Sequence, residues 1–124
     1  MKSTTVAAVV ALCAGAVVLS SPASADTWSG AYSATIVSTY GDGHVVKVYV
    51  EPDHTYRIVP ASGEAITGTW ADSSSQSCFT ITAPAAYAGG APSCYPLRDY
   101  KVGDAFDGVD AQGQSFHGVI TAGR

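Results

Sequence analysis

The chain is short of basic residues, of leucine and of long apolar runs. Its 124 residues include 6 Lys and Arg against 10 Asp and Glu, for a net charge of −4. A nucleic-acid-binding protein needs a basic patch to meet phosphates, so that class is disfavoured. After residue 26 no stretch has helical spacing of apolar residues, and leucine occurs only at Leu97. The 47% hydrophobic content still excludes a disordered chain.

The longest apolar run, Val6 to Leu19, is 14 residues long. As a helix it would rise about 21 Å, which is less than the roughly 30 Å hydrocarbon core of a membrane. Lys2 precedes the run, and Ala23-Ser24-Ala25 follows it with small residues at the two positions that a signal peptidase reads. We therefore predict a secretory signal peptide over residues 1–25, cleaved before Asp26, and not a membrane anchor.

Removal of these 25 residues leaves a single domain of 99 residues, 26–124, with ten acids, five Lys and Arg and a net charge of −5. Cys13 lies inside the apolar run behind Leu12, which excludes a lipoprotein. Cys78 and Cys94 remain, and in the periplasm or outside the cell such a pair is expected to form a disulfide. The alternative, a metal site, is disfavoured because the spacing is not C-x-x-C.

Short runs rich in Val, Ile, Thr and Tyr, separated by Gly, Pro, Asp and Ser, indicate an all-β protein. Eight strands are predicted, over residues 28–40, 44–51, 54–59, 65–71, 77–82, 94–95, 104–110 and 115–121. Each is polar on one face, and successive hairpins favour up-and-down order. A small antiparallel eight-stranded barrel, which would remove exposed edges, is the predicted fold, with a β-sandwich as the alternative.

An outer-membrane barrel is disfavoured, because eight spans of about 9–11 residues would use nearly the whole of residues 26–124. The protein is therefore expected to have no stable membrane insertion, and to be a monomer. A barrel of this size either is filled by side chains or holds one small ligand. The large aromatic residues favour a filled interior; they are Trp28, Tyr32, Tyr56, Trp70, Phe79, Phe106 and Phe116.

Two fragments, Gly30-Ala31-Tyr32 and Gly68-Thr69-Trp70, resemble the G-x-W pattern of lipocalin and avidin-like barrels. The chain is similar in this respect to small exported bacterial proteins of that shape. The resemblance implies that an aromatic side chain, from Trp28, Tyr32 or Trp70, closes one end of the barrel. It also extends to small-barrel metalloprotease inhibitors, which share one disulfide, although an inhibitory N-terminal trunk is missing here.

The segment from Pro84 to Tyr100 breaks the strand rhythm and carries the candidate binding residues, which are Tyr87, Tyr95, Arg98 and Tyr100. Tyr and Arg are enriched at binding hot spots, and a disulfide anchor reduces the entropy that a loop loses on docking. The sequence therefore predicts a non-catalytic binding protein that recognises a protein or envelope partner through residues 84–100. A barrel that carries a small apolar ligand is the alternative.

An enzyme is the third possibility, as a hydrolase or a metal-dependent enzyme that uses His54 or His117. No G-x-S-x-G elbow marks a nucleophilic serine, and His44 is expected at the opposite end of a hairpin from His54. Neither a cofactor nor a metal ion is expected. The series Asp104, Asp107, Asp110 lacks calcium-loop spacing, and residues three apart on a strand point to opposite faces.

Overall fold

The computed structural model describes residues 27–124, which fold into an all-β structure of eight antiparallel strands. These are β1 (Ala34–Tyr40), β2 (Val45–Val50), β3 (Thr55–Pro60), β4 (Ile66–Asp72), β5 (Gln76–Ala83), β6 (Ser93–Pro96), β7 (Ala105–Val109) and β8 (Ser115–Ala122). The predicted signal peptide, residues 1–25, lies outside the described residues, so its cleavage stays a prediction. Within residues 27–124 there is no helix with the length and apolar character needed to cross a bilayer.

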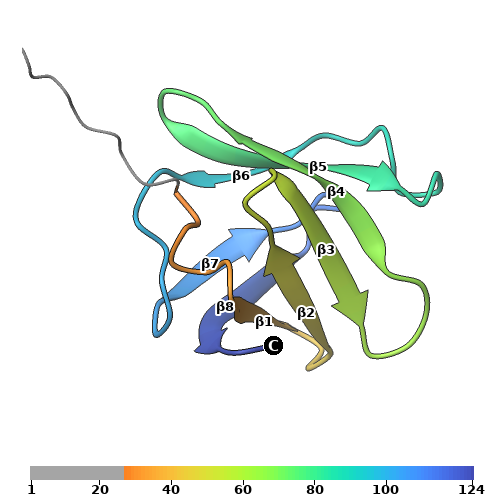
Figure 1. The fold of residues 1–124 in the computed structure, drawn as a ribbon. Coiled ribbons are helices and arrows are strands. Elements are labelled where there is room, and N and C mark those ends of the chain that lie inside the picture. The colour runs from red at the N-terminus through yellow and green to blue at the C-terminus, as the bar shows by residue number, and fades with distance from the viewer. Residues whose placement is uncertain (1–26) are drawn as a thin grey trace, which may run out of the picture.

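One sheet contains all eight strands in the order β6-β5-β4-β3-β2-β1-β8-β7, and it curls into a nearly closed barrel (Figure 1). Every neighbouring pair is antiparallel, and every pair except β1 with β8 is consecutive along the chain. The two ends of the sheet are β6 and β7. The prediction of an up-and-down barrel is therefore confirmed, and the alternative of a β-sandwich is not observed. Sequential hairpins favour this order of strands.

The alternation of β2 shows how the sequence separates the interior from the surface. Val48 lies opposite Ile36 on β1 and Ile58 on β3, so three aliphatic side chains meet in one inward-facing row. Val50 is buried, whereas Lys47 is exposed on the outer face. Because side chains alternate along a strand, this register also determines which side chains of each neighbouring strand point into the barrel.

The first strand begins six residues later than predicted. Residues 27–33 form turns, in which the amide of Ala31 donates to the carbonyl of Trp28 and that of Ala34 to Ala31. The segment runs beside the connection between β6 and β7 (Figure 1). An isolated parallel β-bridge between Gly30 and Lys101 joins the two. A β-carbon on Gly30 would lie 2.7 Å from that of Lys101, so glycine permits this approach.

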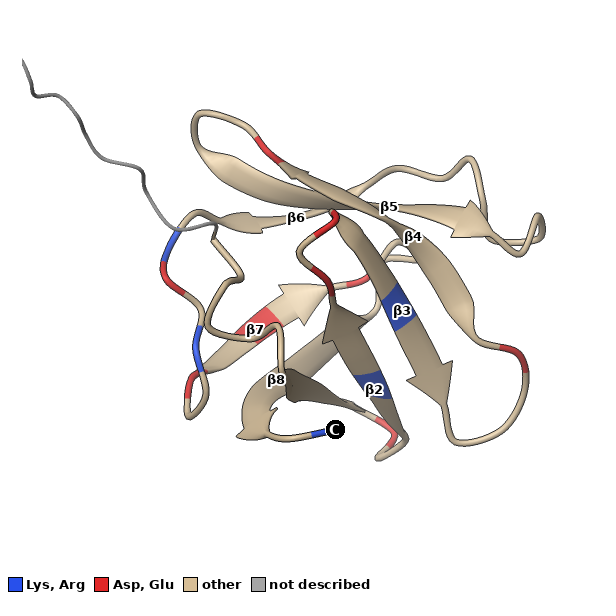
Figure 2. Ribbon diagram, in the orientation of Figure 1, with Lys and Arg blue, Asp and Glu red and all other residues tan. Residues whose placement is uncertain are grey.

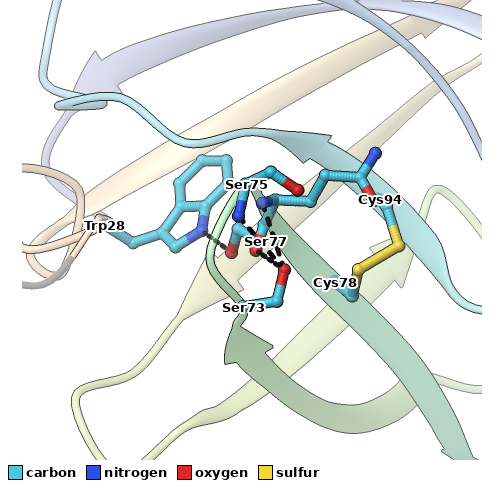
Figure 3. Close-up of a disulfide and its surroundings, with 7 residues drawn as sticks. Trp28, Ser73, Ser75, Ser77, Cys78 and Cys94 are labelled. Carbon is cyan, nitrogen blue, oxygen red and sulfur yellow. Dashed lines mark hydrogen bonds between the residues drawn. A yellow bond between two sulfur atoms is a disulfide. The ribbon is translucent and has the colours of Figure 1, made fainter.

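The end of the barrel crossed by residues 27–33 is the closed end. Trp28 is 1% exposed and stacks on Tyr100 with ring centroids 4.0 Å apart. Its indole Nε1 donates to the hydroxyl of Ser77 at 2.8 Å, as Figure 3 shows. The hydroxyl of Tyr100 in turn donates to the carbonyl of Pro96 at 2.7 Å. Aromatic packing with satisfied polar groups therefore fills this end.

The predicted disulfide between Cys78 and Cys94 is present (Figure 3). The two residues lie directly opposite each other in the pairing of β5 with β6, with their α-carbons 4.1 Å apart. Strand β6 has only four residues and is paired on one side, so the disulfide anchors the shortest strand at the end of the sheet.

Candidate functional site: a cavity at the open end of the barrel

The opposite end, which we call the open end, is formed by the turns 41–44, 61–65, 84–92 and 110–114. A cavity of about 310 Å³ lies inside the barrel and reaches this end. Side chains from all eight strands line it. The expectation of a filled interior is therefore wrong here, although it holds at the closed end.

The cavity exists because several large rings lie against the wall of the barrel and leave its centre empty. A β-carbon on Gly108 would lie 2.7 Å from ring atoms of both Tyr95 and Phe116, so these two rings rest on bare backbone. The inward positions nearest the open end are small or medium in size, for example Val46, Pro60 and Ile66. No side chain among them is long enough to fill the centre.

Aromatic side chains dominate the lining. Eight of the 12 Phe, Trp and Tyr residues in the chain contribute to it, namely Trp28, Tyr40, Tyr56, Phe79, Tyr87, Tyr95, Phe106 and Phe116. The floor of the cavity is Trp28, whose other face packs into the closed end. An apolar, aromatic lining with a few polar groups is typical of small-molecule sites.

The polar groups at the mouth are held in fixed positions. The hydroxyl of Tyr40 donates to Asp110 Oδ2 at 3.0 Å, while Asp110 Oδ1 accepts the amides of Gln112 at 3.0 Å and Gln114 at 2.9 Å. The His44 ring stacks on Tyr40, with centroids 4.3 Å apart, and Nδ1 of His44 contacts the carboxylate of Asp42. Asp110 thus organises the β7–β8 turn and orients the aromatic rim.

The hydroxyls of Tyr40, Tyr56 and Tyr95 in the lining stay protonated at physiological pH. Burial, followed by the hydrogen bond to Asp110, raises the pKa of Tyr40 well above its usual value. Burial likewise raises the pKa of Tyr56, and it raises that of Tyr95 to about 12, with the charge of Asp110 adding to the effect. Each hydroxyl can therefore donate or accept a hydrogen bond inside the cavity.

Two buried hydroxyls in the lining have no hydrogen-bond partner within residues 27–124: those of Ser38, 2% exposed, and Tyr56, 5% exposed. Every fully enclosed side-chain nitrogen or oxygen in this part of the chain does have a partner. The hydroxyls of Ser38 and Tyr56 therefore border the cavity space. A buried polar group without a partner is unfavourable, so both are free to bind a polar group of a ligand.

The four predicted binding residues separate into different places. Tyr87 and Tyr95 line the cavity, and Tyr87 is 45% exposed at its rim. Tyr100 is 2% exposed and lies beneath Trp28. Arg98 is exposed at the closed end, over the Tyr100 ring at 4.6 Å, and donates to the carbonyl of Ala105 at 3.3 Å. Residues 84–100 therefore form part of both ends.

The three histidines lie in different parts of the barrel. His54 stacks on Trp70 at the closed end, with Nδ1 3.1 Å from the Trp70 carbonyl oxygen. His117 Nδ1 lies 2.9 Å from Asp107 Oδ1 on the outside of the barrel. His44 is at the open end, opposite His54, and their separation along the hairpin is as predicted. Within residues 27–124 no group of three His, Cys, Asp or Glu side chains could hold a metal ion.

The three acids of the Asp104, Asp107, Asp110 series point in different directions, as predicted. Asp104 accepts the amide of Lys101 at 3.1 Å, Asp107 pairs with His117, and Asp110 lines the cavity. The sequence pattern had placed Asp110 only in this acidic series and had not predicted that it lines a cavity. It also missed Ser38, although a serine between the inward residues Ile36 and Tyr40 was an available signal for a polar group in the interior.

Comparison of the chain with models of protein families, with curated proteins and with solved structures finds no significant match. The resemblance to lipocalin and avidin-like barrels therefore stays a prediction. The observations that bear on function are the cavity, its aromatic lining and its polar groups.

Proposed function

We propose that this protein is a non-catalytic carrier that binds a small, largely apolar molecule inside its barrel. The observation that carries the proposal is the cavity of about 310 Å³, which side chains from all eight strands line. This volume is at the lower end of the roughly 300–1,000 Å³ range of small-molecule sites. An exported location suits such a carrier, since the ligand would be met outside the cytoplasm.

The geometry supports a small ligand over a macromolecular partner as the occupant. Tyr87 and Arg98 are the two predicted binding residues that a macromolecule could reach from outside, and they lie at opposite ends of the barrel. Tyr100 is buried, and Tyr95 faces the cavity. In this proposal residues 84–100 still take part in binding, because Tyr87 and Tyr95 form one wall of the site.

A cavity-filling substitution tests the proposal. Ser38→Phe places a ring in the centre of the cavity, and we expect it to abolish binding of the neutral fluorescent dye Nile red. Thr39→Phe is the matched control, because Thr39 is the next residue of β1 and is exposed on the outer face. Dye fluorescence titrations and urea denaturation would be measured for both variants.

The wild-type protein and Thr39→Phe are expected to bind the dye alike. Should Ser38→Phe unfold, Val48→Phe fills the same cavity from β2. Binding that persists in a folded, filled variant, or a wild-type protein that does not bind the dye, would overturn the proposal.

Native mass spectrometry of the protein from an exporting host complements the titration. A carrier is expected to retain part of its ligand, as extra mass that disappears on denaturation. The denatured mass also tests cleavage before Asp26 and the loss of two hydrogens at the disulfide.

A further inference from the structure

We propose that the ligand of this cavity is an organic cation, a protonated or quaternary amine with an apolar body. The inference rests on the proposed carrier function and specifies the chemical class of its ligand. Three features carry it: a connected series of aromatic rings, an acidic group without a basic counterpart, and free hydroxyls in the wall.

The first feature is a series of five rings that follow one another around the cavity wall. Tyr56 lies 4.9 Å from Phe79, and Phe79 lies 5.7 Å from Tyr95, measured between ring centroids. The series continues from Tyr95 to Phe116 at 6.2 Å and from Phe116 to Tyr40 at 5.8 Å. Several aromatic rings around one space attract a cation through their negative faces, and such cages recognise quaternary ammonium groups.

The second feature is the distribution of charge. Asp110 is the one acid in the lining, and none of the five Lys and Arg residues of the described part of the chain lines the cavity. Figure 2 shows these basic residues on β2 and β3, between β6 and β7, and at the C-terminus. The turns of the open end contain Asp42, Glu64 and Asp110 and neither lysine nor arginine.

The carboxylate of Asp110 is directed toward the ring series. It accepts the hydroxyl of Tyr40. Burial is the largest cause of the raised pKa of Tyr95, and the negative charge of Asp110 also raises it. His44, the one imidazole in the lining, is exposed and is paired with the carboxylate of Asp42. A cation entering here meets negative potential and aromatic faces, whereas an anion would lose its hydration shell and find neither lysine nor arginine as a partner.

The third feature is the pair of free hydroxyls. Ser38 and Tyr56 border the cavity without a partner within residues 27–124. Their oxygens can accept hydrogen bonds from an ammonium group or from a polar substituent of the ligand. Both residues are more than nine-tenths buried, so these bonds would form away from competing water.

Two probes of the same shape and different charge test the inference. Choline is compared with the neutral alcohol in which a tert-butyl group replaces the trimethylammonium group, by isothermal titration calorimetry at low ionic strength. We expect choline to bind about tenfold more tightly, which corresponds to about 1.4 kcal/mol.

The outcomes separate this inference from the proposed function. Equal or tighter binding of the alcohol, or binding of neither probe while Nile red still binds, overturns the cationic ligand and leaves the carrier function intact. Failure of both probes and of Nile red overturns both proposals.

Matched variants assign the effect to the named groups. Asp110→Asn removes the charge and keeps an oxygen for the amides of Gln112 and Gln114, and choline affinity is expected to fall about five- to tenfold. Asp107→Asn removes the same charge from the outside of the barrel, and its choline affinity is expected to match the wild type. Equal losses in the two variants would show a non-specific effect of net charge and overturn the role of Asp110.

Ring removal provides a second measurement. Phe116→Leu keeps an apolar side chain but interrupts the ring series, so choline binding is expected to weaken by a larger factor than Nile red binding does. If choline binds this variant as it binds the wild type, the aromatic series does not select the cation.

Discussion

The two ends of the barrel use the same kind of residue with opposite results. At the closed end, the rings of Trp28 and Tyr100 stack and their polar atoms bond to Ser77 and Pro96. At the open end, rings stand around an unfilled space, and the hydroxyl of Ser38 has no partner within residues 27–124. The difference arises because residues 27–33 fold across one end and add a side chain from outside the strands.

The largest expected difference between the ends concerns their aromatic residues. Trp28→Ala should lower the free energy of unfolding by about 3–5 kcal/mol, because it leaves a void in a packed region. Phe116→Ala should lower it by about 1–2 kcal/mol, because this ring already borders a cavity. Urea denaturation of both variants measures the two losses. Equal losses would show that the open end is packed as tightly as the closed end.

Loss of the disulfide should weaken both ends together. Replacing Cys78 and Cys94 by serine should lower the free energy of unfolding by about 3 kcal/mol, as expected for a loop of this length. Strand β6 carries Tyr95, whose ring packs against Trp28 and also lines the cavity. Denaturation and Nile red titration would be measured together, with the wild type under reducing conditions as the control. Dye binding unchanged by the substitution would mean that β6 holds its place without the disulfide.

High pH should affect the protein through the tyrosines of the open end. Tyrosine ionises near 10.0 when unfolded, whereas native Tyr95 keeps its proton to about 12. Between these values the native state holds a proton that the unfolded state has lost, so the contribution of Tyr95 to stability is unchanged below about pH 10 and falls above it. For Tyr95 the fall approaches about 2 kcal/mol. Urea midpoints between pH 8 and 12 should show a shallower fall for Tyr95→Phe, and identical slopes would contradict this assignment.

The smallest expected effect is that of Ser38→Ala at the open end, which is compared with Ser77→Ala at the closed end. Ser77→Ala removes the acceptor of the buried Trp28 N–H and should destabilise by about 1–3 kcal/mol. Ser38→Ala removes a hydroxyl with no partner in the described residues and should change stability by less than about 0.5 kcal/mol. Thermal unfolding of the two variants compares them directly. A large loss for Ser38→Ala would show that its hydroxyl is bonded in solution.

Alternation along the strands was enough to predict the barrel wall. The inward row of Val46, Val48 and Val50 follows from period-two spacing, and the Gly41-Asp42-Gly43 turn follows from residues that tolerate positive φ, as Gly43 does at 91°. The disulfide followed from an isolated cysteine pair in a chain with a predicted export signal. These features depend on local sequence, which is why they could be read from it.

The cavity could not be predicted in this way, because it depends on contacts between distant strands. Composition indicates that aromatic residues are sufficient to fill a small barrel, but not where their rings lie. Tyr95 and Phe116 rest on Gly108, which belongs to a different strand from either ring. Trp28 was wrongly predicted to lie in the first strand. Apolar spacing does not distinguish a strand from turns that fold over the end of the barrel.

The unpaired edges of β6 and β7 give the barrel a lengthwise seam. Across it, Tyr95 packs over Gly108 and Arg98 donates one hydrogen bond to the carbonyl of Ala105. Widening the barrel at β1 and β8 would break a continuous ladder of backbone bonds, whereas widening at the seam disrupts mainly side-chain contacts. The circumference of the barrel can therefore change more easily at this seam than between the paired strands. Amide hydrogens on the outer edges of β6 and β7 should exchange with solvent faster than those between β1 and β8.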